Sequence, residues 1–176
     1  MTLANNDLEH YTGRFLGMRE RRGWEYTYRT NASGVVVMVP VTDDGNLVLV
    51  EQYRIPVECR VLELPAGLAG DAGDRDEAFE LAAQRELIEE TGFKAAHLEE
   101  LMTSPSSSGL TNEMVTIFYA SGLQKIGPGG GDGNEDITVH LVPLPDAVSW
   151  LEQKRQAGFM IDPKIFAGLF WAGLRT

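Results

Sequence analysis

The residues best suited to chemistry are four charged side chains in one short segment, Arg85, Glu86, Glu89 and Glu90. The spacing of apolar residues over 77–91 predicts a helix there. At about 100° per residue, the three carboxylates share one arc of the helix surface. That crowding is unfavourable, because like charges repel and the C-terminal end of a helix dipole disfavours anions. A hard cation such as Mg²⁺ would relieve both penalties, so the pattern indicates a metal site.

A solvated acidic face would have the same carboxylates, with Arg85 as an ordinary ion-pair partner. The apolar residues of the segment stand on nearly opposite sides of the helix, Leu81 and Ile88 on one side and Ala83 and Leu87 on the other. This distribution predicts a helix packed between two surfaces. Both interpretations of the carboxylates are compatible with such a helix.

Residue types that cap helices mark both ends of the segment. Asp74, followed three positions later by Glu77, fits a capping box that would satisfy the first backbone N–H groups. Gly92 stands where a helix-ending glycine is expected. We therefore expect a helix from Glu77 to Thr91, in which Glu77 is as readily a capping residue as a catalytic one.

This segment resembles the Nudix box, whose pattern is Gly-x5-Glu-x7-Arg-Glu-aliphatic-x-Glu-Glu-x-Gly-aliphatic. Glu77 and the run 85–93 match it, and Pro65-Ala66-Gly67 resembles its leading loop. So many fixed positions make a chance match improbable. Nine residues separate Gly67 from Glu77 where the family usually has five, so the chain carries a four-residue insertion before the helix.

The resemblance covers most of the chain, from Trp24 to about Ala172, in the manner of the ADP-ribose and nucleotide-sugar pyrophosphatase branch. Its further matching segments are Trp24-Glu25-Tyr26, Glu51-Gln52-Tyr53-Arg54, Leu62-Glu63-Leu64, Ser104-Pro105 ahead of Gly109-Leu110-Thr111-Asn112-Glu113, and Gly133-Asn134-Glu135-Asp136-Ile137. The family implies an α/β/α sandwich with a mixed β-sheet between helices. It also implies a homodimer with exchanged N-terminal strands.

The resemblance assigns metal ligands residue by residue. Glu86 and Glu90, together with the Ala66 carbonyl, match the ligands of the family, and Glu89 is a frequent additional ligand. Arg85 matches the arginine that orients these carboxylates by hydrogen bonding to them. The cofactor implied is Mg²⁺, with Mn²⁺ as a possible substitute.

A carboxylate from a later loop is implied to bind metal or to activate water. Glu135 matches it, and Asp132 and Asp136 on the same loop are the alternatives. Glu113 is a second candidate, for contact with substrate or for the base.

Two further residues match positions that bind substrate. Arg54 matches a diphosphate-binding arginine, whose guanidinium suits phosphate oxygens. It could instead pair with Glu51 or Glu58. Trp24 matches an aromatic residue that stacks on the base, and its alternative role is packing in a dimer interface.

The activity implied is attack by water on a phosphorus of a nucleoside diphosphate sugar, with ADP-ribose giving AMP and ribose 5-phosphate. Bound metal ions would offset the charge of the diphosphate and lower the pKa of a water. The alternatives are hydrolysis of GDP-mannose or another nucleotide sugar, a non-catalytic Nudix-fold nucleotide sensor, and a Ca²⁺-binding structural domain.

The elements that must position these residues can be predicted from periodicity and turn signals. The fold class expected is α/β (α+β), with residues 1–33 as N-terminal, dimer-forming strands and 34–176 as the hydrolase domain. Asp43–Asn46 is the expected turn of a hairpin, and 127–133 a mobile glycine-rich loop. The expected strands are Trp24–Arg29, Gly34–Val41, Leu47–Gln52, Val61–Leu64, Leu98–Thr103, Met114–Ala120 and Ile137–Val142, and the later helices are Asp146–Ala157 and Pro163–Leu174.

The composition and charge of the chain limit the kinds of partner that we expect. With 43% hydrophobic and 23% charged residues, the chain of 176 residues has the balance of an ordinary globular unit. No apolar run reaches the length of a membrane span and the start lacks an export signal, so we expect a cytoplasmic protein without a membrane partner. The net charge of −11 argues against nucleic acid as a partner. The single cysteine, Cys59, excludes an internal disulfide.

Overall fold

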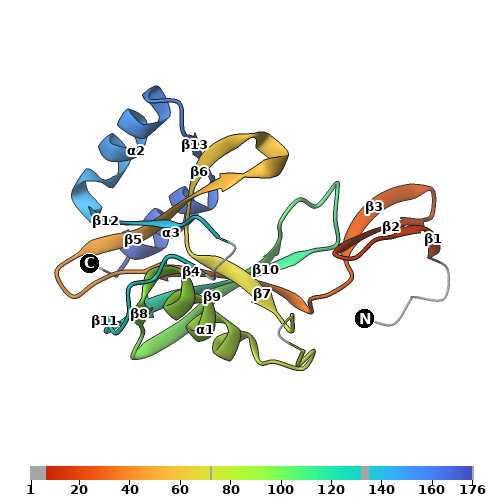
Figure 1. Ribbon diagram of the computed structural model, residues 1–176, viewed down its shortest axis with the longest axis horizontal. Helices are drawn as coiled ribbons and strands as arrows, with labels where there is room; N and C mark the ends of the chain where they lie inside the picture. Colours follow the sequence, from red (N-terminus) through yellow and green to blue (C-terminus); the bar gives the residue numbers. More distant parts are fainter. Residues whose placement is uncertain (1–6, 72, 132–134, 176) are drawn as a thin grey trace.

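Two mixed four-stranded sheets form the body of the protein in the computed structural model, which describes residues 7–71, 73–131 and 135–175 (Figure 1). The strands of the first sheet, in spatial order, are β7 (Ala66–Ala69), β4 (Gly34–Pro40), β10 (Met114–Ser121) and β9 (His97–Pro105). Those of the second are β12 (Thr138–Pro143), β5 (Asn46–Arg54), β6 (Cys59–Glu63) and β13 (Met160–Ile161).

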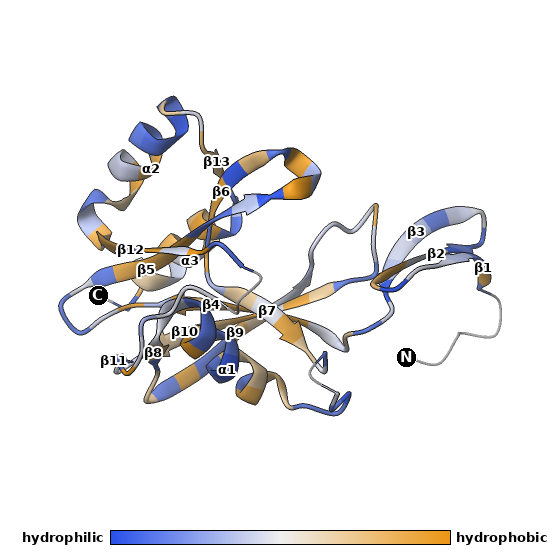
Figure 2. Ribbon diagram, viewed as in Figure 1, coloured by the Kyte–Doolittle hydropathy of each residue, from blue (hydrophilic) through white to orange (hydrophobic). Residues whose placement is uncertain are grey.

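Strand β4 is buried on both faces, which explains its almost continuous apolar sequence. Val36 and Met38 pack with the helix α1 (Phe79–Thr91). Val37 and Val39 point the other way, into the core shared with the second sheet. The alternation has the period of two that a strand requires. Figure 2 shows the hydrophobic colouring of β4 and β10 at the centre of the molecule.

The helices α2 (Ala147–Gln156) and α3 (Lys164–Gly173) complete the core shared by the two sheets. Leu151 of α2 and Ile165 of α3 are buried there beside residues of β5 and β6. Strands therefore lie between α1 on one side and α2 and α3 on the other. The expected α+β fold with mixed β-structure between helices is confirmed, although the strands divide into two mixed sheets.

The first three strands form a separate antiparallel sheet that projects from the body (Figure 1). They are β1 (Leu8–Thr12), β2 (Leu16–Arg21) and β3 (Trp24–Arg29). Thr27 joins this sheet to the body, because its N–H donates to the Leu110 carbonyl and its own carbonyl accepts from Asn112. The role expected for residues 1–33 in a dimer remains a prediction.

No helix in the described part of the chain has the length and apolar character to cross a membrane. The remaining elements of the fold are short. They are β8 (Phe93–Lys94), which pairs with β11 (Gln124–Lys125), and the single-turn helices η1 (Ile55–Val57) and η2 (Leu144–Asp146).

The turn at residues 43–46 forms, but the expected hairpin does not. After the turn, β5 joins the second sheet, and only an isolated bridge between Val41 and Leu47 links it to β4. Both edges of β4 are already occupied, by β7 and β10. The returning strand must therefore pair elsewhere.

The predicted capping box is wrong. Helix α1 begins at Phe79 and its N-cap residue, Ala78, makes no side-chain cap. The Glu77 carboxylate instead accepts the N–H of Gly70, so it lies back against the end of β7. At the other end Gly92 adopts the left-handed conformation that was expected of it.

The two packing surfaces of α1 also differ from the expectation. Ala83 and Leu87 are buried against the first sheet, whereas Leu81 is exposed. The carboxylate side of the helix faces β7, the edge strand of the same sheet, where Glu90 accepts the N–H of Ala66. The helix therefore packs against one sheet, through apolar contacts and through a hydrogen bond of Glu90.

Candidate active site

A cavity of about 400 Å³ brings together most of the residues that the sequence singled out. Its lining comes from α1, four strands (β3, β4, β5 and β7), the segment after β7 and the segment before β12, and several of these are far apart along the chain. Seven expected site residues line it, namely Arg54, Ala66, Arg85, Glu86, Glu89, Glu90 and Glu135. Arg29 and Asp71 line it as well, and no sequence pattern had indicated either of them.

Strand β7 holds two carboxylates of α1 in place. Glu90 is only 3% exposed and accepts the N–H of Ala66 at 3.0 Å. Glu86 lies directly against Gly67, since a Cβ built on that glycine would stand 1.9 Å from the Glu86 carboxyl carbon. Ala66 and Gly67, the first two residues of β7, therefore supply both a hydrogen bond and the space that the carboxylates need.

Burial raises the pKa values of both carboxyl groups. The pKa of Glu90 rises to about 8, mainly through desolvation and further through the charges of Glu135 and Glu86. The pKa of Glu86 rises to about 7, again mainly because of desolvation, against the opposing effect of Arg85. Positive charge near these oxygens would favour the ionised forms and reverse the shifts.

Arg85 connects the acidic residues to one another. Its guanidinium donates to Glu77, Glu86, Glu89, Asp71 and the Leu68 carbonyl, at distances of 2.8 to 3.4 Å. The hydrogen bond from Arg85 lowers the pKa of Glu77. Glu77 therefore anchors this arginine, and the insertion before the helix contributes Asp71 to the same network. The orienting role expected for Arg85 remains a prediction.

The carboxylates fit a hard divalent cation by their chemistry. Glu86, Glu89, Glu90 and the backbone of Ala66 offer only oxygen ligands within one cavity, the donor type that Mg²⁺ prefers. As the side chains stand, the described residues include no group of three acidic, histidine or cysteine side chains arranged to hold an ion. Glu86 and Glu89 point to Arg85 instead. A bound cation would therefore have to exchange with the arginine.

Arginine side chains form the cationic part of the cavity. Arg54 donates to Glu63 at 2.7 Å, and not to Glu51 or Glu58, the partners considered from the sequence. Arg29 donates to Glu113 at 2.5 Å. Both guanidinium groups thus have an acidic partner on one side while lining the site.

Two expected substrate-binding residues lie outside this cavity. Glu113 lines a neighbouring cavity of about 410 Å³, which shares Arg29 with the first. Trp24 lines neither cavity. Its indole N–H donates to the Gly109 carbonyl at 3.2 Å and most of its side chain is exposed. The structure therefore brings Glu135, but neither Glu113 nor Trp24, to the carboxylates of α1.

The chain belongs to the NUDIX domain family, whose model matches residues 32–162. It is 34% identical over 122 residues to an ADP-ribose pyrophosphatase of Bacillus subtilis. It is also 32% identical over 123 residues to a methanol dehydrogenase activator of Bacillus methanolicus. Each alignment covers 69% of this chain but only 64% of the relative.

A solved structure has the same fold. The crystal structure of an ADP compounds hydrolase matches with a TM-score of 0.69 and 24% sequence identity, covering 94% of this chain and 89% of that one. A match over nearly the whole chain confirms the fold class predicted from the sequence.

Proposed function

We propose that the protein hydrolyses the diphosphate of a nucleoside diphosphate sugar with the help of Mg²⁺, and that ADP-ribose is its substrate. The observation that carries the proposal is the joint lining of one cavity by five carboxylates and three arginines. Carboxylates suit a divalent cation, and guanidinium groups suit the phosphate oxygens of the substrate. A volume of about 400 Å³ lies within the range of small-molecule sites.

The residues divide the work by their positions. Glu86, Glu89, Glu90 and the Ala66 carbonyl would hold the cation, which when bound offsets the diphosphate charge and acidifies a water. Arg54 and Arg29 would bind phosphate oxygens on the cationic side of the cavity. Positioning and charge neutralisation are the main requirements of this chemistry.

Glu135 would accept the proton of the attacking water. The water oxygen forms a bond to one phosphorus, the bridging P–O bond breaks, and the second phosphate leaves with its own half of the substrate. From ADP-ribose the products are AMP and ribose 5-phosphate. Arg85 would release Glu86 and Glu89 to the cation and stay anchored beside them through its bonds to Glu77.

The test is a substrate panel in Mg²⁺, with and without EDTA, comprising ADP-ribose, GDP-mannose and a deoxynucleoside triphosphate. We expect AMP and ribose 5-phosphate from ADP-ribose, and no turnover in EDTA. Glu90→Gln should lower kcat by several orders of magnitude, because a neutral amide cannot replace a carboxylate ligand. Glu152→Gln, on the outer surface of α2, is the matched control and should retain full activity.

Each other outcome has a defined meaning. Near-wild-type turnover of Glu90→Gln at saturating Mg²⁺, with unchanged circular dichroism, would remove that residue from the metal site. Binding of ADP-ribose without turnover would identify a sensor. Preferential cleavage of GDP-mannose would change the substrate but keep the reaction, and binding of Ca²⁺ alone would identify a structural domain.

A further inference from the structure

The segment 125–131, which leads toward Glu135, is bound to the C-terminal end of α1. Gly130 and Gly131 donate their N–H groups to the carbonyls of Glu90 and Glu89, at 2.8 and 3.0 Å. These last carbonyls of a helix have no partner within the helix itself. The loop expected to be mobile therefore begins, over these residues, as a cap on the helix that carries the carboxylates.

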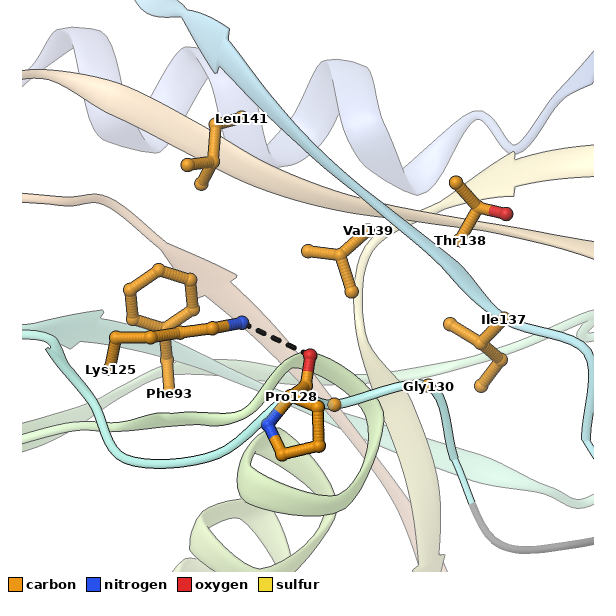
Figure 3. Close-up of a pocket in the computed structure, with 9 residues that line it drawn as sticks. Phe93, Lys125, Pro128, Gly130, Ile137, Thr138, Val139 and Leu141 are labelled. Atoms are coloured by element: carbon orange, nitrogen blue, oxygen red, sulfur yellow. Dashed lines mark hydrogen bonds between the residues drawn. The ribbon is translucent and has the colours of Figure 1, made fainter.

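Lys125 strengthens the same attachment. Its ammonium donates to the Thr91 carbonyl at 2.6 Å and to the Pro128 carbonyl at 3.2 Å, and the second bond is drawn in Figure 3. Gly129 permits the close approach, because a Cβ there would stand 2.5 Å from the Thr91 carbonyl carbon. One stem of the segment that carries Glu135 is thus fixed to α1.

The other stem is fixed by Arg60 of β6. Asp136 directly follows Glu135, and its carboxylate accepts Nη1 of Arg60 at 2.8 Å. Nη2 of Arg60 donates to the Asp136 backbone carbonyl at 3.4 Å. The guanidinium therefore holds both the side chain and the main chain of the residue next to Glu135, where β12 is about to begin.

Arg60 is itself immobilised by a buried carboxylate. Its Nε donates to Glu51 at 2.5 Å, and Glu51 also contacts His140 at 2.9 Å and Lys154 at 3.4 Å. An isolated surface ion pair contributes little, partly because two long side chains must be ordered. Here the contact with Glu51 already orders the Arg60 side chain, so little further entropy is lost when its guanidinium bonds to Asp136.

We propose that Arg60 is a positioning residue for Glu135, acting through Asp136 to set where the Glu135 carboxylate lies in the cavity. This inference rests on the proposed function, in which Glu135 accepts a proton. Arg60 does not line the cavity of the carboxylates. Its effect on the reaction would therefore be exerted through the chain position of Glu135.

The test is a pair of double-mutant cycles, in which Arg60→Gln and Asp136→Asn are each measured alone and together with Glu135→Gln. Misplacement of a catalytic group by about 1 Å can cost roughly 100-fold in rate. We expect each single variant to lower kcat by about 10-fold to 100-fold with little change in KM. In the Glu135→Gln background neither should lower kcat further, because the group that they position is gone.

Two controls separate positioning from general destabilisation. Asp136→Asn should keep the thermal stability of the wild type, since the Asp136 side chain is 81% exposed and the contact of Arg60 with Glu51 survives. Arg60→Lys should recover part of kcat, because an ammonium can still donate to either acid but lacks the planar fork. Arg155→Gln, on the surface of α2, should behave as wild type.

The proposal is overturned if Arg60→Gln and Asp136→Asn lower kcat by the same factor in the Glu135→Gln background as in the wild type. It is also overturned if the Asp136→Asn enzyme has wild-type kcat. Hydrogen exchange supplies a readout that needs no activity. Both variants should speed amide hydrogen exchange in residues 137–142 and leave exchange in α2 unchanged. Unaltered exchange in residues 137–142 would also overturn the proposal. If the wild type cleaves no nucleotide sugar, the proposed function fails. The hydrogen-exchange result still shows whether the contact of Arg60 with Asp136 holds the chain next to Glu135 in place.

Discussion

The three carboxylates that α1 contributes to the cavity differ in their freedom to move. Glu90 is almost fully buried and bonded to the backbone of β7, whereas the Glu89 side chain is 47% exposed. Glu86 lies between them, pressed against Gly67 and bonded to Arg85. A fixed, buried oxygen suits a permanent ligand, and an exposed one suits exchange with water or substrate. We therefore expect Glu90 and Glu86 to be the permanent ligands of the proposed cation, and Glu89 the exchangeable one.

Substitution of Gly67 tests this assignment without altering any charge. In Gly67→Ala the new methyl group would occupy the position of the Glu86 carboxylate, 1.9 Å from its carbon, so Glu86 must move. We expect kcat to fall by roughly 100-fold and the Mg²⁺ concentration required for half-maximal rate to rise. Steady-state kinetics over a Mg²⁺ series checks both.

Gly173→Ala is the matched control, because a Cβ at that position of α3 meets nothing within 4 Å. It should leave kcat and the Mg²⁺ dependence unchanged. A Gly67→Ala enzyme with wild-type kinetics and unfolding temperature would mean that the position of Glu86 is unimportant.

Most site residues could be predicted from the sequence because they lie at fixed spacing on one helix. Glu86, Glu89 and Glu90 follow from a local pattern, and their common arc is a property of helical geometry. Arg29 and Asp71 were missed, because they reach the cavity through tertiary contacts that leave no periodic signal. The partner of Arg54 was missed for a related reason, since Glu63 lies on a neighbouring strand.

At the scale of elements, strands with an alternating or continuous apolar pattern were predictable, including the largely exposed β3 and β9, and strands without such a pattern were not. The apolar strands β4, β5 and β10 were found from alternation or continuous hydrophobicity. N-terminal strands were expected over 1–33, but β1 and β2 were not given bounds there, because their residues are mostly charged or exposed. β7 and β13 are too short for any periodicity. The hairpin prediction failed because local sequence cannot show that both edges of β4 are taken.

The Glu51 cluster on β5 predicts a pH dependence of stability. Burial alone would raise the pKa of Glu51, but hydrogen bonds from His140 and Arg60 and the charge of Lys154 outweigh it, so the pKa is lowered from 4.5. A carboxyl group whose pKa is lower in the folded state stabilises the protein when the pH is above its unfolded-state pKa. This contribution is lost as the pH falls through the folded-state pKa.

Urea unfolding of wild type and Glu51→Gln between about pH 7 and pH 3.5 measures this contribution. We expect the wild type to be more stable at neutral pH and the difference in unfolding free energy to shrink below about pH 4.5. A difference that stays constant across the range would show that Glu51 gains nothing from ionisation in the folded protein.

At the scale of the whole molecule, the N-terminal sheet exposes a cluster of apolar side chains on one face. In the strand register, Leu8 stands opposite Glu20, Tyr11 opposite Met18, and Leu16 two positions before Met18 on β2. Residues related in this way point to the same face of a sheet. Leu8, Tyr11 and Leu16 are all exposed there. Such a surface is typical of a protein–protein interface, so we retain the prediction of a homodimer.

Sedimentation equilibrium at micromolar concentration tests the dimer. We expect Leu16→Glu to give a monomer, because a charge would be buried in an apolar contact. Phe170→Glu alters a similarly exposed residue of α3 and should leave the dimer intact. If Phe170→Glu gives the monomer and Leu16→Glu does not, the contact lies on α3.

The parallel pairing of β4 with β10 has a consequence for the order in which the chain can fold. Val35 of β4 lies opposite Val115, so this edge of the apolar strand has no partner until β10 has been synthesised. Pairing between residues so distant in sequence is slow, because the entropy of closing a long loop is lost before any stabilising contact forms. An unpaired apolar edge promotes aggregation in the meantime. Truncation before residue 114 should therefore yield an insoluble product, however completely it preserves the carboxylates of α1.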